Sequence, residues 1–245
     1  MSLLSDKLNL FKPSLTVKIS QKARELKKLG KNIISLSSGE PDFDTPKHIK
    51  NAAIKAINNG ITKYTPVDGL LELKKAIKKK FKNENNLEFN INQITVGVGG
   101  KHVIYNLFMS TLNKDDEVII PSPFWVSYPD IVSLCGGKSI ILETDEESKF
   151  KISPQRLKLL INKNTKWLVL NSPSNPTGSV YSENELKEIS DILTHYKQVL
   201  ILTDDIYEHL IYENQKFFNI LNVEPKLYER VFIVNGVSKA FSMTG

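Results

Sequence analysis

The sequence KWLVLNSPSNPTGSVYSENELKEISDILTHYKQVLILTDD, residues 166–205, alternates strand-like apolar runs with one helical pattern. Residues 166–171 and 199–203 are almost uninterrupted apolar runs, which is typical of strands buried on both faces of a sheet. Between them, residues 183–196 have helical periodicity, and Ser182 followed by Glu185 is the signature of a capping box. This order of elements predicts part of a mostly parallel sheet.

The same alternation continues on both sides of this stretch. Further candidate strands cover residues 33–37, 94–98, 117–121, 138–142 and 231–235. Further helical patterns cover about residues 47–59, 68–82, 101–112, 124–134 and 154–161. The chain is therefore predicted to be an α/β protein of three layers, in which helices flank a mostly parallel sheet on both sides.

Composition sets limits on the class of protein. The 245 residues are 40% hydrophobic and 24% charged, which gives room for one large α/β domain and argues against disorder. No apolar run approaches the ~20 residues of a membrane span, so no membrane partner is expected. Residues 1–11 contain Asp6 and Lys7 and do not resemble a secretory signal. With Cys135 as the single cysteine, a cytoplasmic location is expected.

The net charge of +6 is carried mostly by lysines that are spread along the chain. No nucleic-acid motif accompanies them, so no nucleic-acid partner is expected. The densest run, residues 74–82, falls on a helical pattern whose apolar positions share one face. Its lysines are therefore predicted to form a solvated surface.

Ligands of such sheets bind beyond the carboxyl ends of the strands, so the residues that follow each strand are considered as one candidate site. Gly99, Gly100 and Lys101 lie between a candidate strand and a helix, where backbone N–H groups can hold an anion. A tight turn without a ligand is the alternative. The run is neither a nucleotide P-loop nor a dinucleotide fingerprint.

Three further groups follow strands. Residues 171–178 form a loop made rigid by two prolines and a glycine, which either aims the Asn175 amide at a ligand or is an Asn-Pro turn. Asp204 and Tyr207 follow the strand at 199–203, and Asp204 is either a local cap or a buried carboxylate that pairs with a cationic ligand. Lys239 has small and apolar neighbours, which favour a desolvated amine able to form a Schiff base over an ordinary surface lysine.

Taken together, these motifs resemble the fold-type-I pyridoxal-phosphate enzymes, and within them the class I aminotransferases. The bacterial aspartate and aspartate/prephenate aminotransferases are the most similar subgroup. The resemblance covers the whole chain and is carried by residues 38–43, 63–66, 99–101, 125–128, 171–178, 204–207 and 238–239, in the order of the family. It implies the large domain of that fold, a homodimer, and pyridoxal 5'-phosphate as cofactor, with no metal.

The resemblance assigns roles around the cofactor. Lys239 would form the Schiff base and later move the substrate proton, and Asp204 would pair with the pyridine nitrogen. Tyr207 and Asn175 would hydrogen-bond the phenolic oxygen, and Trp125 would stack on the ring.

It also assigns the residues around the phosphate. The turn at Gly99, Gly100 and Lys101 would hold the phosphate, with Ser238 as a further contact. Tyr64 would reach the phosphate of the neighbouring subunit.

Substrate contacts follow from the same resemblance. Gly39 and Asn175 would bind the α-carboxylate beside Trp125, and Lys101 would pair with the distal carboxylate of aspartate or glutamate. Lys12 matches a position linked to prephenate, with an exposed arm lysine as the alternative. The expected activity is transfer of an amino group from aspartate or glutamate to a 2-oxo acid. Another enzyme on this scaffold, such as an aromatic transaminase or a carbon–sulfur lyase, and a silent fragment are the alternatives.

The resemblance also implies a domain plan. Residues 1–13 would be an arm, residues 14–46 the first part of a small domain, and residues 47–245 the cofactor-binding large domain. A transcription regulator is not expected, because residues 1–30 are too short for a DNA-binding domain. Since the family continues beyond Gly245 with two functional arginines and most of its small domain, a truncated chain that does not transaminate alone is expected.

Overall fold

In the part of the chain that the structure describes, five parallel strands make one sheet, in the order β2-β1-β3-β4-β5. The computed structural model describes residues 3–10, 15–36 and 39–245. Its strands are β1 (Glu117–Pro121), β2 (Lys138–Leu142), β3 (Thr165–Asn171), β4 (Leu200–Asp204) and β5 (Val231–Val234). Each was expected from an apolar run at the same place, to within about one residue, so the prediction of a parallel α/β sheet is confirmed.

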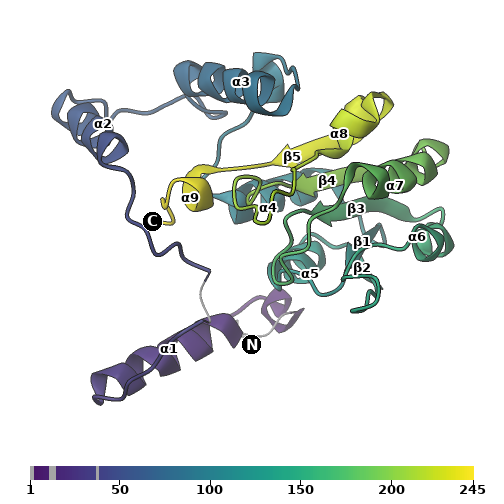
Figure 1. Ribbon diagram of the computed structural model, residues 1–245, viewed down its shortest axis with the longest axis horizontal. Helices are drawn as coiled ribbons and strands as arrows, with labels where there is room; N and C mark the ends of the chain where they lie inside the picture. Colours follow the sequence, from purple (N-terminus) through teal and green to yellow (C-terminus); the bar gives the residue numbers. More distant parts are fainter. Residues whose placement is uncertain (1–2, 11–14, 37–38) are drawn as a thin grey trace.

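Helices connect the strands and cover the sheet (Figure 1). The longer ones are α1 (Leu15–Lys28), α2 (Lys47–Asn58), α3 (Leu71–Asn85), α4 (Gly100–Thr111), α5 (Ser127–Leu134), α6 (Pro154–Leu160) and α7 (Glu183–His195). Shorter turns of helix are η1 (Asp6–Leu10), η2 (Ile91–Gln93), α8 (Ile220–Val223), η3 (Pro225–Arg230) and α9 (Val237–Ala240). The capping box of α7 forms as predicted, since Ser182 and Glu185 each bond the other's backbone N–H.

Two apolar clusters lie on opposite faces of the sheet, because successive side chains of a strand point to opposite sides. In β1, Ile119 belongs to one cluster, together with Ile189 and Leu193 of α7. Its neighbours Val118 and Ile120 belong to the other, which includes residues of α4 and α5. The sheet is therefore the middle of three layers, as expected.

The structure corrects two predicted strands. Residues 31–36 form no strand, and Ile34 and Leu36 are exposed; Ser37 lies outside the described residues. Residues 94–98 do not join the sheet either, because their N–H groups bond elsewhere. Val96 donates to the carbonyl of Asp68, and Val98 donates to Nδ1 of His102. The apolar residues at these places therefore do not mark strands of the sheet.

The prediction that the lysines of α3 form a solvated surface is wrong in part. Lys74 is only 4% exposed and forms an ion pair with Asp68. Lys80 is partly buried and forms an ion pair with Glu208, next to a predicted site residue. Both lysines reach carboxylates that precede or lie far from the helix in sequence, so helical periodicity alone could not reveal the pairs.

Helix α1 was not predicted from the sequence. It lies near the N-terminus and apart from the sheet (Figure 1). The chain then returns past α9 before it enters α2 (Figure 1). Within the described part of the chain, no helix has the length and apolar character needed to cross a membrane.

Candidate functional site

The carboxyl ends of β3, β4 and β5 lie side by side, because Asn171 is in register with Asp204 and Asp204 with Val234. Asn171 Nδ2 donates to the backbone carbonyl of Asp204 at 2.8 Å, and its Oδ1 accepts from the N–H of Asn175 at 2.7 Å. This asparagine therefore ties the Asn175 loop to the end of β4. Asn175 and Asp204 therefore lie at the same edge of the sheet, as predicted.

Asp204, the last residue of β4, is a buried carboxylate, 6% exposed. Oδ2 accepts from the hydroxyl of Tyr128 at 2.6 Å, and Oδ1 accepts from the N–H of Ile206 at 3.3 Å. Burial raises the pKa of Asp204, although both hydrogen bonds oppose the rise. In the described ranges no cation pairs with this carboxylate. A buried carboxylate of this kind is suited to a cationic ligand.

Tyr128 is the partner of Asp204 that sequence reasoning did not find. Its hydroxyl is buried, and burial followed by the charge of Asp204 raises the pKa of Tyr128 well above its ordinary value. Tyr128 therefore stays a hydrogen-bond donor. The available signal was its place in the helical pattern at 124–134, one turn after Trp125, because residues three apart share a helix face.

Tyr207 and Asn175 face each other across the site. Burial and then the charge of Asp204 raise the pKa of Tyr207, while a hydrogen bond with the Asn175 side chain opposes the rise. A pocket of about 320 Å³ opens beside these two side chains and is lined further by residues of the loops 173–180 and 210–215. The two side chains thus meet at an accessible surface.

Trp125 and Lys101 also come together. The ammonium of Lys101 lies 5.2 Å from the centroid of the Trp125 ring. The ring of Trp125 in turn packs edge-on against Tyr128, with centroids 5.3 Å apart. Trp125 therefore connects an exposed cation on α4 with the tyrosine that holds Asp204.

The turn at Gly99 and Gly100 begins α4. Gly99 has φ 101°, a conformation that favours glycine, and no atom lies within 4 Å of the place where a Cβ would stand. A Cβ on Gly100 would lie 3.8 Å from Val234, at the end of β5. The first N–H groups of a helix have no partner within it. This open turn next to β5 can therefore hold an anion.

Lys239 in α9 is half-buried, and its Nζ donates to the backbone carbonyl of Gly39 at 2.6 Å. Two more hydrogen bonds join the same two segments. Thr45 Oγ1 donates to the carbonyl of Ser242 at 2.6 Å, and Thr244 Oγ1 donates to Glu40 Oε1 at 2.7 Å. The N-terminal segment that contains Gly39 is thereby fixed against α9 and the residues that follow it.

Three predicted residues remain outside this arrangement or at its margin. Tyr64 lies between α2 and α3 with a fully exposed side chain, at 107%. Ser238 is part of α9, one residue from Lys239, and its carbonyl accepts from the N–H of Met243. Lys12 lies outside the described residues.

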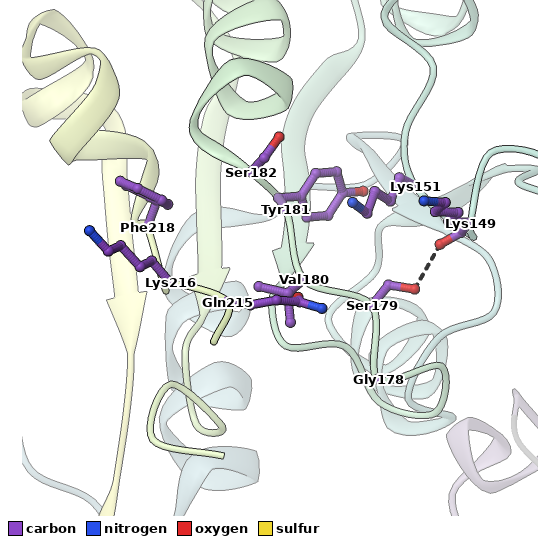
Figure 2. A pocket seen from close by; sticks show the side chains of 10 residues that line it. All are labelled: Lys149, Lys151, Gly178, Ser179, Val180, Tyr181, Ser182, Gln215, Lys216 and Phe218. Atoms are coloured by element: carbon purple, nitrogen blue, oxygen red, sulfur yellow. Dashed lines mark hydrogen bonds between the residues drawn. The ribbon is translucent and has the colours of Figure 1, made fainter. Parts of the chain in front are cut away.

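A second pocket, of about 410 Å³, contains none of the predicted site residues (Figure 2). It lies beside the start of α7 and includes three lysines, of which Lys151 forms an ion pair with Glu185 and lies near the ring of Tyr181. Figure 2 shows the hydroxyl of Ser179 turned toward the carbonyl of Lys149, to which it donates at 2.7 Å. The sheet edge, where most of the predicted site residues meet, is therefore the better candidate site.

Comparison with known proteins agrees with this assignment. The chain matches the family described as aminotransferase class I and II over residues 31–245. It is 54% identical to a probable aspartate/prephenate aminotransferase of Rhizobium leguminosarum bv. phaseoli and 50% identical to the aspartate/prephenate aminotransferase of Cereibacter sphaeroides. Each alignment covers 100% of this chain and 61% of the relative, so the chain spans less than two thirds of their length.

Solved structures give the same result. The chain superposes on the aspartate aminotransferase from Rhizobium meliloti with a TM-score of 0.95 and on that from Thermus thermophilus with maleate with a TM-score of 0.94. Identity is 43% in both cases, and the alignments cover all of this chain and 61% and 63% of those chains. The sheet, its site edge and a family match over most of the sequence together show that the chain belongs to the aminotransferase class I and II family.

Proposed function

We propose that this chain binds pyridoxal 5'-phosphate at the carboxyl ends of β3, β4 and β5 and contributes to an aspartate-type aminotransferase. The reaction would move the amino group of aspartate or glutamate to a 2-oxo acid such as 2-oxoglutarate. The observation that carries this proposal is the buried Asp204 carboxylate, which is held by Tyr128 and has no cationic partner among the described residues.

The residues present fit such a cofactor. Asp204 would hold a protonated pyridine nitrogen, and the pair would remove the cost of leaving a buried carboxylate without a counter-charge. The open turn at Gly99 and Gly100 would hold the phosphate, with Ser238 on α9 as a further contact. When bound, the cofactor supplies an electron sink for negative charge on the substrate Cα.

The side chains around it have separate tasks. Lys239 would attach the cofactor and then move a proton to and from the substrate Cα, a task for which its hydrogen bond to Gly39 keeps the amine in place. Tyr207 and Asn175 would donate to the phenolic oxygen of the cofactor, which explains why they face each other. Trp125 would stack on the ring, and Tyr128 at its edge would fix its plane.

A dicarboxylic substrate is supported by the cation at Lys101, which lies over the Trp125 ring on the exposed side of α4. Lys101 would pair with the distal carboxylate, and Gly39 and Asn175 would bind the α-carboxylate. The Thermus thermophilus relative was solved with maleate, a dicarboxylate. Prephenate, which the names of the relatives include, is proposed as a further substrate of the complete site, with Lys12 as its contact.

The proposal extends to assembly and domains. The exposed Tyr64 supports a homodimer in which this tyrosine reaches the phosphate of the partner subunit. The separation of α1 from the sheet supports a small domain that begins with residues 14–46, after an arm of residues 1–13 and before the large domain of residues 47–245. The single, buried Cys135 supports a reducing cytoplasmic setting.

The test is a spectral titration of the purified chain with pyridoxal 5'-phosphate, followed by half-reactions with aspartate, glutamate, tyrosine and alanine. The expected result is a visible absorbance band that aspartate and glutamate abolish first, at slow rates, because the chain alone is not expected to transaminate at a useful rate. Fastest loss with tyrosine would replace the substrate class with an aromatic one. Absence of binding by this chain, or equally tight binding by an Asp204→Asn variant, would refute the proposal. The full-length Thermus thermophilus enzyme, assayed in parallel, provides the positive control.

A further inference from the structure

Glu208 is a buried carboxylate that directly follows the predicted cofactor contact Tyr207. It is 7% exposed and accepts hydrogen bonds from three side chains that belong to two segments of the chain. Lys80 and Asn85 come from α3, where Asn85 Nδ2 donates at 2.6 Å, and Asn235 comes from the loop after β5. One carboxylate therefore joins α3, the turn after β4 and the start of the connection to α9.

The charge of this carboxylate is already balanced. Hydrogen bonds and the charge of Lys80 hold the pKa of Glu208 below its ordinary value, although burial acts in the opposite direction. Glu84 and His209 lie close enough to form a three-ligand cluster with Glu208. The ammonium of Lys80, 3.8 Å from Glu84 and in contact with Glu208, supplies the positive charge there, so the cluster does not require a metal ion.

Glu208 reaches Lys239 through a short series of contacts. The Nδ2 of Asn235 donates to Glu208, which leaves Oδ1 of the same amide to accept from the N–H of Gly236 at 2.6 Å. Gly236 is the residue before α9, the helix that contains Lys239. A Cβ at Gly236 would lie 3.1 Å from Ile206, so this turn also packs tightly against the segment between Asp204 and Tyr207.

We infer that Glu208 is a positioning residue that sets Tyr207 and Lys239 relative to each other, through the turn at Gly236. The N–H of Glu208 bonds the carbonyl of Asp205, so the same turn of backbone holds Glu208 and Tyr207. Asn235 carries the constraint to α9. The role in catalysis rests on the proposed function, whereas the coupling between Glu208 and the Gly236 turn stands on these contacts alone.

The test uses Glu208→Gln, Asn235→Ala and the double variant, with Glu188→Gln as a matched control at an exposed glutamate of α7. Glutamine replaces one acceptor oxygen of Glu208 with an NH2 group, which cannot accept a hydrogen bond. Depending on which oxygen is replaced, the side chain loses the bond from Asn85 or the bonds from Lys80 and Asn235. Asn235→Ala removes the amide that joins Glu208 to Gly236 but leaves Glu208 its bonds from Lys80 and Asn85, and it gives a second route if Glu208→Gln fails to fold. Two readouts are measured: hydrogen exchange of the backbone over residues 235–240 without cofactor, and the rate at which pyridoxal 5'-phosphate and borohydride label Lys239.

Both single variants are expected to speed exchange over residues 235–240 and to slow labelling of Lys239 by about tenfold, the effect of losing one hydrogen bond to a charged group. Exchange in β1 and β2 and all properties of Glu188→Gln should stay unchanged. The double variant should lose no more than the worse single variant, because both changes break the same link.

Unchanged exchange over residues 235–240 in the folded variants would overturn the inference, as would additive losses in the double variant. Equal loosening of β1 and β2 would also overturn it, because Glu208 would then act on the whole fold. If the wild-type chain is labelled at another lysine while exchange over residues 235–240 still responds, the proposed function fails and the coupling is upheld.

Discussion

The amine of Lys239 and the backbone carbonyl of Gly39 lie 2.6 Å apart, although 200 positions separate them in the sequence. Gly39 is thereby brought to the edge of the sheet without being part of any strand. A carbonyl oxygen only accepts hydrogen bonds, so this contact orients the Lys239 amine and occupies one of its N–H groups. The hydrogen bond has to be exchanged before the amine can attach to a carbonyl compound.

Lys239 is expected to be the lysine that reacts with pyridoxal 5'-phosphate. Incubation of the chain with this compound, reduction with borohydride and peptide mapping should give label at Lys239, because this amine lies beside the Asp204 edge and is half-buried. Lys239→Arg should abolish the label, and Lys226→Arg, at an exposed lysine of η3, should not. Equal labelling of Lys239→Arg and wild type would remove Lys239 from the site.

Asp204→Asn is expected to weaken cofactor binding without weakening the fold. Loss of a charge-assisted partner for the pyridine nitrogen should cost roughly 1.5–3 kcal/mol, about a 10- to 150-fold rise in Kd. The thermal midpoint of the chain without cofactor should stay the same or rise, because the carboxylate has no cationic partner there. An absorbance titration and a melting curve check the two parts, and a large fall in the midpoint would contradict the assignment.

The free energy of unfolding should depend on pH through Asp205, the second buried carboxyl group. Burial raises the pKa of Asp205 well above the ordinary 3.8, and the hydrogen bond from Asn219 only partly opposes the rise. The folded state therefore holds this proton more tightly than the unfolded state. Its stabilising effect is complete below pH 3.8 and is lost as the pH rises toward the folded-state pKa.

Denaturant unfolding of wild type and Asp205→Asn over a pH series that starts below the ordinary 3.8 and ends at neutral pH would measure this effect. The free energy of unfolding of wild type, relative to the variant, should fall by up to about 1.4 kcal/mol per pH unit within the titrating window. A difference that stays level or rises with pH would show that Asp205 is stabilised as a carboxylate.

Lys101→Ala is expected to affect acidic substrates more than apolar ones. Only aspartate and glutamate bring a second carboxylate, so loss of its partner should slow their half-reactions by about tenfold or more relative to alanine. Lys101→Arg should keep most of the preference for acidic substrates. An equal loss for aspartate and alanine would instead make Lys101 a contact of the phosphate or of Trp125 alone.

The fold was predictable where burial on both faces of a strand leaves a mark in the sequence. β1, β3 and β4 are apolar runs, and their packing between two clusters explains why. The exposed residues 31–36 and the loop at 94–98 contain the same residue types, but their backbone partners are not those of a strand. The periodicity of a sequence shows which side chains are apolar, but it does not show which groups the backbone hydrogen-bonds.

The site was predictable to the extent that it follows the carboxyl ends of parallel strands. Asn175, Asp204 and Tyr207 meet because β3 and β4 are neighbours in register. The residues that position these side chains could not be predicted from the order of strands. Tyr128 and Glu208 act through contacts with residues 76 and 128 positions away, and such separations are set by the packing of layers.

The hydrogen bond between Thr45 and Ser242 spans 197 positions and has a consequence for the time course of synthesis. At roughly 5–20 residues per second, the ribosome completes Ser242 about 10–40 s after Thr45. The sheet from β1 to β4 can form in that interval, while the segment around Gly39 still has no surface to bind. The site edge is therefore assembled last, and during translation the segment before α2 stays accessible to chaperones and proteases for tens of seconds.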